Sequence, residues 1–388
     1  MSVQISDHIK YVGADDRELD LFEGQYIVPN GISYNSYVIL DEKTAILDTV
    51  DNRKTTEWFD NLSTVLGDRS PAYLIISHME PDHAGNIKEA AEKYPSMQLV
   101  GNGKTFQMMK QFFDSDFSDR CVEVKEGDKL SLGEHELTFM MAPMVHWPEV
   151  MVSYESREKV LFSADGFGKF GALSVDEDWA CEARRYYFNI VGKYGMQVQA
   201  LLKKAALLDI RMICPLHGPV LKEHLDYYIE KYHIWSSYQP EDEGVLVASA
   251  SAHGNTREAA LKLVEKLEKA GLKVAFTDLT RDDMAEAVED AFRYDRMVVC
   301  ACTYDGGLFP AAEAFLAHLK SKNYQNRRVG LVENGTWAPM AAKCMRAAFE
   351  GMKNITVLDA VVTIKSKLNA ESESQMDALV AELKGECS

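Results

Sequence analysis

The chain has 388 residues, of which 46% are hydrophobic and 26% charged, and its formal net charge at pH 7 is −18. This length exceeds what one hydrophobic core usually serves, so we expect two domains. The negative charge argues against nucleic acid as a partner, because binding it requires Lys and Arg to neutralise phosphates. No run approaches the roughly 18 to 20 apolar residues of a membrane span, and no signal peptide is visible, so we expect a cytoplasmic protein.

The seven cysteines are scattered along the chain, and no two of them form a CxxC pair. A rubredoxin or zinc-ribbon module needs such pairs, so the sequence excludes a built-in module of either kind. We expect the thiols to be reduced and mostly buried.

The N-terminal part of the chain predicts an α/β sandwich, in which groups of strands alternate with helices. Apolar and polar residues alternate from Gln25 to about Val50, which indicates a hairpin or meander. Further along, the pattern predicts a strand at residues 73–77, a helix at 86–94, a strand at 98–100, a helix at 105–113, hairpins at 130–141 and 150–164, helical periodicity at 178–208 and a strand at 211–214.

A cluster of Pro, Gly and acidic residues at Tyr238–Gly244 marks a boundary, so we place the two domains at residues 1–240 and 243–388. Beyond it, strands and helices alternate strictly. This alternation predicts an open, doubly wound parallel sheet, in which ligands bind at loops that leave the carboxyl ends of strands. The expected strands are 245–249, 274–278, 297–301, 329–332 and two near Val357 and Ile364, and the expected helices are 256–270, 284–292, 311–319, 340–349 and 372–383.

Potential metal ligands are concentrated in the segment HMEPDH, which directly follows the strand at residues 73–77. Imidazoles and carboxylates together suit iron, manganese or zinc, and two metals can be held where a carboxylate bridges them. Three later candidates each follow a predicted strand, and one edge of a sandwich would gather them with this segment. Each alone is as readily a core or helix-capping residue, but the combination favours a metal site. The candidates are His78, Glu80, Asp82, His83, His146, Asp165 and His217.

Three loops of the C-terminal part could hold a ligand that carries a phosphate and a planar ring, such as a flavin nucleotide, which the resemblance described below implies. The first opens a helix, and N–H groups at a helix N-terminus together with Ser and Thr hydroxyls make a phosphate site. It has neither the GK[ST] of a Walker loop nor a GxGxxG fingerprint, and by itself such a cluster is more often a turn with a helix cap. The later two loops offer glycines and an aromatic side chain to a flavin ring. The candidates are Ser251, His253, Gly254, Asn255 and Thr256, then Thr303, Tyr304, Asp305, Gly306 and Gly307, and finally Asn334, Gly335, Thr336 and Trp337.

These motifs resemble a known family. The pattern HxExDH with later His, Asp and His resembles the metallo-β-lactamase fold, whose hydrolases mostly carry HxHxDH. Glu80 in place of the second His, with the phrases HMEPDHAGN, LFSADGFG and CPLHGP, resembles the flavodiiron proteins, or A-type flavoproteins. The first nucleotide loop resembles the FMN-phosphate loop of flavodoxins, and TYDGGLFP resembles the flavodoxin domain of the family. The resemblance covers nearly the whole chain, with the two domains in the family's order.

The resemblance implies a metallo-β-lactamase-like αββα sandwich followed by a flavodoxin-like, five-stranded parallel sheet. FMN would pass electrons to a non-haem di-iron centre that reduces O2 to water, NO to N2O, or both. No catalytic residue beyond the metal ligands is implied. In this scheme one iron is ligated by His78, Glu80 and His146, the other by Asp82, His83 and His217, and Asp165 bridges them.

The resemblance also implies partners. A separate donor, such as rubredoxin or an NADH-linked reductase, would supply electrons, and a head-to-tail homodimer, or a dimer of such dimers, would bring the FMN of one chain to the irons of another. Two alternatives stay open. A metal-dependent hydrolase fused to a flavodoxin would use a metal-bound hydroxide, although Glu80 speaks against zinc. A non-catalytic sensor of O2 or NO would be expected to carry a signalling output domain.

Overall fold

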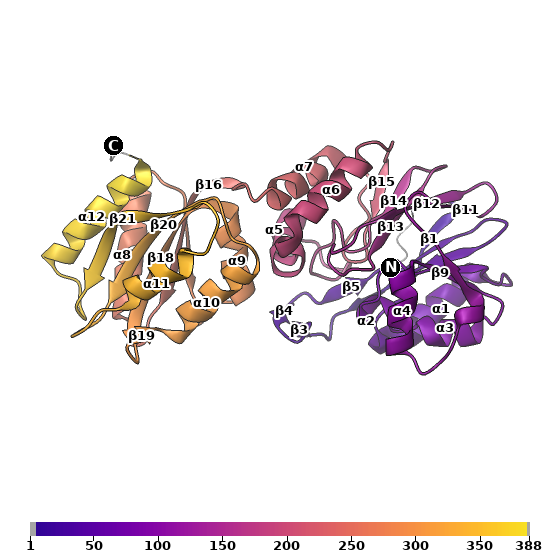
Figure 1. The fold of residues 1–388 in the computed structure, drawn as a ribbon, viewed down its shortest axis with the longest axis horizontal. Coiled ribbons are helices and arrows are strands. Elements are labelled where there is room, and N and C mark those ends of the chain that lie inside the picture. The colour runs from indigo at the N-terminus through magenta and orange to yellow at the C-terminus, as the bar shows by residue number, and fades with distance from the viewer. Residues whose placement is uncertain (1–4, 386–388) are drawn as a thin grey trace. The chain divides into compact units, whose positions relative to one another are not determined.

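The computed structural model describes residues 5–385, which form two compact units (Figure 1). The first unit runs to Tyr187 and includes Met196–His233, whereas the second comprises Phe188–Gly195 and the chain from Ile234 onward. The domain limits expected from the sequence, 1–240 and 243–388, stay a prediction. Among residues 5–385, no helix has the length and hydropathy that crossing a bilayer requires.

Two sheets enclose the core of the first unit. One has the strand order β1-β6-β7-β8-β9-β10 and the other β11-β12-β13-β14-β15, and the small pairs β2-β5 and β3-β4 lie outside them. Alternate side chains of both sheets, among them Ile39, Ile75, Phe139 and Phe162, point into one shared apolar core, as in a sandwich. The predicted sandwich is therefore confirmed. Its strands are β1 (Ile9–Tyr11), β2 (Ala14–Asp16), β3 (Leu21–Phe22), β4 (Tyr26–Ile27), β5 (Ile32–Tyr34), β6 (Tyr37–Ile39), β7 (Ala45–Leu47), β8 (Tyr73–Ile75), β9 (Gln98–Gly101), β10 (Cys121–Glu123), β11 (Lys129–Ser131), β12 (Glu136–Met141), β13 (Met151–Glu155), β14 (Val160–Phe162) and β15 (Met212–Cys214).

The helices of this part of the chain differ from the prediction in two respects. The helical pattern at residues 178–208 is two helices, because a π-helical turn, Tyr187–Val191, and a 3-10 turn, Gly192–Tyr194, interrupt it. Three helices, α1, α2 and α7, were not predicted; α1 buries only three side chains, those of Trp58, Leu62 and Leu66. The helices are α1 (Thr55–Leu66), α2 (Pro81–Ala84), α3 (Ile87–Lys93), α4 (Gly103–Phe112), α5 (Trp179–Tyr186), α6 (Gly195–Ala205) and α7 (Leu225–Ser236).

The second unit is a five-stranded parallel sheet in the order β17-β16-β18-β20-β21, to which β19 adds a short antiparallel pair with β18. Helices α8 and α12 pack on its apolar core through Leu263, Leu267 and Leu379. The doubly wound sheet is thus confirmed. Its elements are β16 (Asp242–Ala250), α8 (Asn255–Lys269), β17 (Val274–Asp278), α9 (Met284–Arg293), β18 (Tyr294–Tyr304), β19 (Gly307–Leu308), α10 (Pro310–Ser321), β20 (Arg327–Asn334), α11 (Ala341–Phe349), β21 (Ile355–Ile364) and α12 (Ala370–Lys384).

Two expectations need correction. The two strands expected near Val357 and Ile364 are one strand, β21, whose pairing with β20 shifts register between Val329 and Leu331. The cysteines are not mostly buried, because only Cys214 and Cys300 of the six in the described residues are. Those six form no disulfide, and Cys387 lies outside the described residues.

A buried histidine ties together three turns of the sandwich. His135 Nδ1 lies 2.7 Å from Asp41 Oδ2, which also accepts the N–H of His135, and His135 Nε2 lies 3.3 Å from Glu158 Oε1. Burial works to raise the pKa of Asp41, but the hydrogen bonds from His135 and the neighbouring backbone hold that pKa at about 2. The ionised carboxylate therefore stabilises the fold.

We predict that Asp41→Asn lowers the free energy of unfolding at pH 7 by about 1–2 kcal/mol. Because the folded-state pKa lies below the ordinary value of 3.8, the carboxylate contributes fully above about pH 4, and this contribution disappears as the pH falls toward 2. Chemical denaturation of the wild type and the variant from pH 7 down to pH 3 measures the difference. A gap that stays constant on acidification would contradict this account.

Candidate functional site

Four loops that leave the carboxyl ends of strands carry the predicted metal ligands. The loop after β8 enters α2 at Pro81, so ligands lie both on the loop and in the first turn of the helix. The loops after β12, β14 and β15 each supply one more side chain. In chain order the residues are His78 and Glu80 before α2, Asp82 and His83 within it, and then His146, Asp165 and His217.

The structure brings all seven side chains together in two adjoining groups. Within each group, ligand atoms lie within 4.8 Å of one another. Nearly all of these side chains are buried, and only Glu80 is partly exposed. The first group is His78, Glu80, His146 and Asp165, and the second is Asp82, His83 and His217.

Asp165 faces both groups with different oxygens. Its Oδ2 lies 3.4 Å from His78 Nε2 and 3.2 Å from His146 Nε2. Its Oδ1 lies 3.2 Å from His83 Nε2 and 3.9 Å from His217 Nε2. A carboxylate in this position could bridge two metal ions, one in each group.

The polar atoms of the cluster lack the partners that buried groups need. Both carboxylate oxygens of Asp82 and of Asp165 are buried with no hydrogen-bond partner among residues 5–385, and His83 Nε2 lies only 3.1 Å from His217 Nε2. Buried carboxylates are costly unless they are paired or coordinate a metal. Because nitrogen and oxygen lone pairs converge here without a thiolate, the residues fit two ions of the iron, manganese or zinc type.

Electrostatics support this assignment. Burial works to lower the pKa of His78, but Asp165, Glu149 and Glu80 raise it well above its ordinary value. Burial works to raise the pKa of Asp165, yet His78 and the other imidazoles hold it well below its ordinary range. Positive charge therefore stabilises the buried carboxylates of the cluster, and protons or metal cations can supply it.

Sequence reasoning missed the side chains that hold these ligands. Glu149 Oε1 accepts hydrogen bonds from His78 Nδ1 and from the Met79 N–H, each at 2.8 Å. Asp48 Oδ1 accepts from the Ser77 N–H at 2.7 Å. Asp48 follows strand β7, just as Asp165 follows strand β14. A search for acidic residues at the ends of predicted strands could therefore have identified Asp48. The sequence signal for Glu149 is weaker, because it consists only of the position of this residue three places after the candidate ligand His146.

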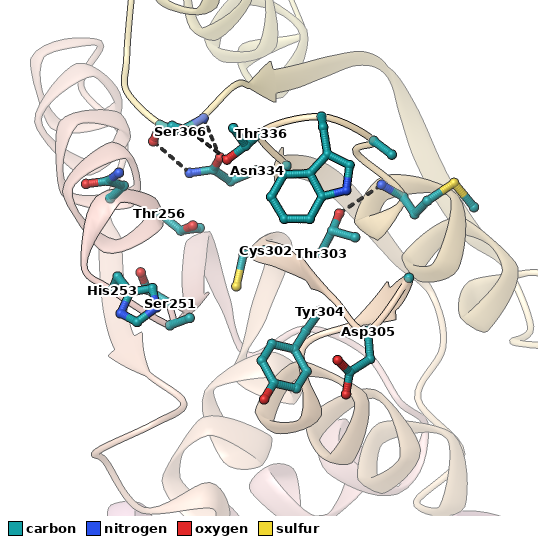
Figure 2. A pocket seen from close by; sticks show the side chains of 17 residues that line it. Ser251, His253, Thr256, Cys302, Thr303, Tyr304, Asp305, Asn334, Thr336 and Ser366 are labelled. Carbon is teal, nitrogen blue, oxygen red and sulfur yellow. Dashed lines mark hydrogen bonds between the residues drawn. The ribbon is translucent and has the colours of Figure 1, made fainter.

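A cavity of about 580 Å³ in the second unit lies among the loops that follow β16, β18, β20 and β21 (Figure 2). Of the predicted flavin contacts, only Gly254 and Gly307 are outside its lining. The lining also contains Ala252, Cys302, Ala338, Met340 and Ser366, which were not predicted. Ser366 follows the fifth strand of the sheet, so its position after a strand could have indicated it.

The first loop leaves the N-terminus of α8 open toward this cavity. Gly254 adopts a φ of 96°, which glycine tolerates at no steric cost, and its N–H donates to Ser251 Oγ at 3.0 Å. No side chain within the described chain caps α8, whose first residues, Asn255 and Thr256, line the cavity. The described lining contains no Lys or Arg, so an anionic group here would depend on backbone N–H groups and hydroxyls.

Several predicted contacts of the other two loops also hold the loops together. Thr303 Oγ1 accepts from the Met340 N–H at 2.8 Å. The Asn334 side chain bonds both the N–H and the carbonyl of Ser366, and Thr336 Oγ1 lies 2.6 Å from Ser366 Oγ (Figure 2). These bonds fix the loops as walls of the cavity, and direct contact of these residues with a flavin stays a prediction.

Two aromatic residues border the same cavity. Trp337 is 91% exposed and Tyr304 is 48% exposed. Exposed aromatic rings beside a cavity offer flat apolar surfaces that a ligand or a partner can cover. The two rings could stack on a planar ligand.

Comparisons with known proteins agree with this geometry. A model of the "ODP family beta lactamase" matches residues 32–218. An anaerobic nitric oxide reductase flavorubredoxin of Vibrio vulnificus is 28% identical over 351 residues, which cover 87% of this chain and 70% of that protein. A diflavin flavoprotein of Nostoc is 30% identical over 334 residues, covering 82% of this chain and only 57% of that protein.

The fold has a solved counterpart over its whole length. Rubredoxin oxygen:oxidoreductase from Desulfovibrio gigas matches with a TM-score of 0.91 and 25% identity, covering 100% of both chains. The matched structure thus includes both the sandwich and the parallel sheet.

We predict that Asp165→Ala removes more bound metal than His146→Ala. Asp165 faces both groups, whereas His146 belongs to one, so His146→Ala should keep about half of the metal and Asp165→Ala almost none. Elemental analysis of the purified proteins measures the content. Equal losses in the two variants would contradict a bridging position for Asp165.

Proposed function

We propose that this chain, a flavodiiron oxidoreductase, reduces O2 to water, NO to N2O, or both. The observation that carries this proposal is the pair of ligand groups that share Asp165. We propose that His78, Glu80 and His146 hold one iron, that Asp82, His83 and His217 hold the other, and that Asp165 bridges them. Glu80 adds a carboxylate where zinc hydrolases of this fold use a histidine, which favours iron over zinc.

FMN is the cofactor that we propose for the cavity of the second unit. Its phosphate would bind at the open N-terminus of α8, beside Ser251, Asn255 and Thr256, and its ring would lie near Tyr304 and Trp337. When bound, FMN supplies one- and two-electron transfer, and the two irons bind and polarise a diatomic molecule.

A cavity beside the metal groups would admit a small substrate. The rings of Phe22 and Tyr186 each lie 5.5 Å from that of His217. A cavity of about 370 Å³ reaches Glu80 and Asp82 past Leu21 and Tyr34. Its lining combines the apolar and aromatic side chains of Leu21, Phe22 and Tyr34 with charged side chains, among them Glu23 and Arg53, and a cavity of this size would admit a diatomic gas.

Electrons would come from a separate donor, such as rubredoxin or an NADH-linked reductase. The names of two relatives, flavorubredoxin and rubredoxin oxygen:oxidoreductase, support a donor of this kind. We also propose a cytoplasmic, head-to-tail homodimer or dimer of such dimers, with domains at residues 1–240 and 243–388.

The proposed reaction predicts a defined cofactor content and a defined reactivity. The purified chain should contain about two irons and one FMN. Mixed anaerobically with O2 or NO in a stopped-flow instrument, the reduced protein should be reoxidised by at least one of the gases. Asp165→Ala, with FMN but without iron, is the matched control and should react far more slowly. Protein that holds only zinc after growth in iron-rich medium would favour the hydrolase alternative.

We predict that Trp337→Ala weakens FMN binding about three- to tenfold, because one stacked aromatic ring contributes about 0.5–1.5 kcal/mol. Since this side chain is 91% exposed, the unfolding temperature of the flavin-free protein should not change. Titration of the flavin-free protein with FMN, followed by flavin fluorescence, gives the affinity. Unchanged affinity would place the ring elsewhere in the cavity.

A further inference from the structure

The two halves of the metal centre have different outer hydrogen-bond partners. In one half, His78 Nδ1 lies 2.8 Å from a carboxylate oxygen of Glu149, and both side chains are fully buried. In the other half, His217 Nδ1 lies 2.7 Å from the backbone carbonyl of Ser33. His83 Nδ1, in that same half, is buried with no hydrogen-bond partner in the described part of the chain. At Nδ1, His78 therefore has an anionic partner, His217 has a neutral one, and His83 has none among the described residues.

Glu149 is itself held in place at two points. Its Oε1 accepts the Met79 N–H, and its backbone carbonyl accepts a hydrogen bond from Asn102 Nδ2. Asn102 is in turn fixed, because its Oδ1 accepts the N–H groups of Lys104 and Thr105 as the cap of α4. The carboxylate thus has a fixed direction toward the His78 ring.

His78 is also held at its backbone. Asp48 Oδ1 accepts the Ser77 N–H at 2.7 Å and the His78 N–H at 3.3 Å. The ring and the main chain of this ligand are therefore anchored by carboxylates from two different loops. Such anchoring leaves Nε2 of His78 directed at Glu80 and Asp165, which lie 3.2 Å and 3.4 Å away.

A carboxylate behind a ligating imidazole has two effects. It fixes the proton on Nδ1, so that Nε2 offers its lone pair to the metal, and it makes the ring a stronger donor. A backbone carbonyl also fixes the tautomer, but it adds no charge. The second oxygen of Glu149 is buried and has no hydrogen-bond partner among the described residues, so its negative charge is directed at His78 and at whatever cation that ring binds.

We propose that Glu149 is a positioning residue that makes the His78 half of the centre bind its metal more tightly than the His217 half. The proposal rests on the proposed di-iron function, since it requires two metals per chain. The proposal also gives the order of metal binding. The first ion enters the half formed by His78, Glu80 and His146, and that ion is the last to be lost.

The test is an anaerobic titration of the metal-free full chain with Co²⁺ in the presence of a competing chelator. The visible absorption of bound Co²⁺ reports the ligand field of each ion as it binds. We expect two different affinities in the wild type. Glu149→Gln keeps an oxygen that can accept from His78 Nδ1 and Met79 but removes the charge. It should weaken the tighter site about 10- to 100-fold, leave the weaker site within about twofold, and shift the absorption of the first ion bound.

Two backgrounds identify the half that responds. His217→Ala should leave the tighter site, and Glu149→Gln should weaken that site as strongly as in the wild type. His78→Ala damages the tighter half, and there Glu149→Gln should have no further effect on the ion that still binds. Mutations that act on one metal are non-additive, whereas mutations that act on separate metals add.

Two further variants control for changes in folding. Glu155 is a fully buried carboxylate at the other end of β13, where it accepts the N–H groups of Arg157 and Glu158, so Glu155→Gln should change neither affinity. Asn102→Ser keeps a hydroxyl that can cap α4 but removes the amide that holds the Glu149 carbonyl. It should weaken the tighter site alone, by a smaller factor, and it tests the proposal even if Glu149→Gln does not fold.

The outcomes separate this proposal from the function on which it rests. Uptake of fewer than two Co²⁺ by the wild type would overturn the proposed di-metal centre. If two ions bind with equal affinity, or if Glu149→Gln weakens both sites equally, neither site, or only the His217 half, the role of Glu149 is wrong and the di-metal centre stands.

Discussion

The two ligand groups of the first unit meet at one buried carboxylate, that of Asp165. Its two oxygens are sealed from water, and no hydrogen-bond donor among residues 5–385 reaches them within bonding geometry. Only the imidazoles on either side, and the cations that those imidazoles can help to bind, offset its charge. Without bound cations or protonated imidazoles, this buried negative charge therefore lowers the stability of the fold. The apolar core between the two sheets must offset that cost.

Strand register gives the cluster its geometry. Phe162 of β14 pairs with Cys214 of β15, so Asp165 and His217 each lie three residues beyond a matched pair and reach the same edge. Leu47 of β7 likewise pairs with Ile75 of β8, which brings the next residue, Asp48, against the Ser77 N–H. A slip of one residue in either pair would turn these side chains to the other face of the sheet.

This register explains which parts of the site could be predicted from the sequence. Ligand candidates after strands follow from periodicity and from the rule that strand ends gather at one edge, and the structure does bring His146, Asp165 and His217 together. The groups that hydrogen-bond to the candidate ligands from behind cannot be predicted by such a rule. Glu149 reaches His78 across the fold, and the Ser33 carbonyl has no side-chain signature at all. In the second unit, polar groups such as Thr303 were predicted to contact a ligand, but the Thr303 hydroxyl also accepts a hydrogen bond from a neighbouring loop. The sequence alone does not distinguish a free hydroxyl from one that caps a helix.

The candidate sites of the two units differ in the charge that they present. The candidate ligand carboxylates of Glu80, Asp82 and Asp165, with the carboxylates of Glu149 and Asp48 behind them, make a strongly anionic site that suits two divalent cations. The cavity of the second unit has no Lys or Arg in its described lining, so a phosphate there would be bound by backbone N–H groups and hydroxyls. A chain with a net charge of −18 can therefore offer both a site for cations and a site for an anionic group, because the local surroundings decide the charge that each site accepts.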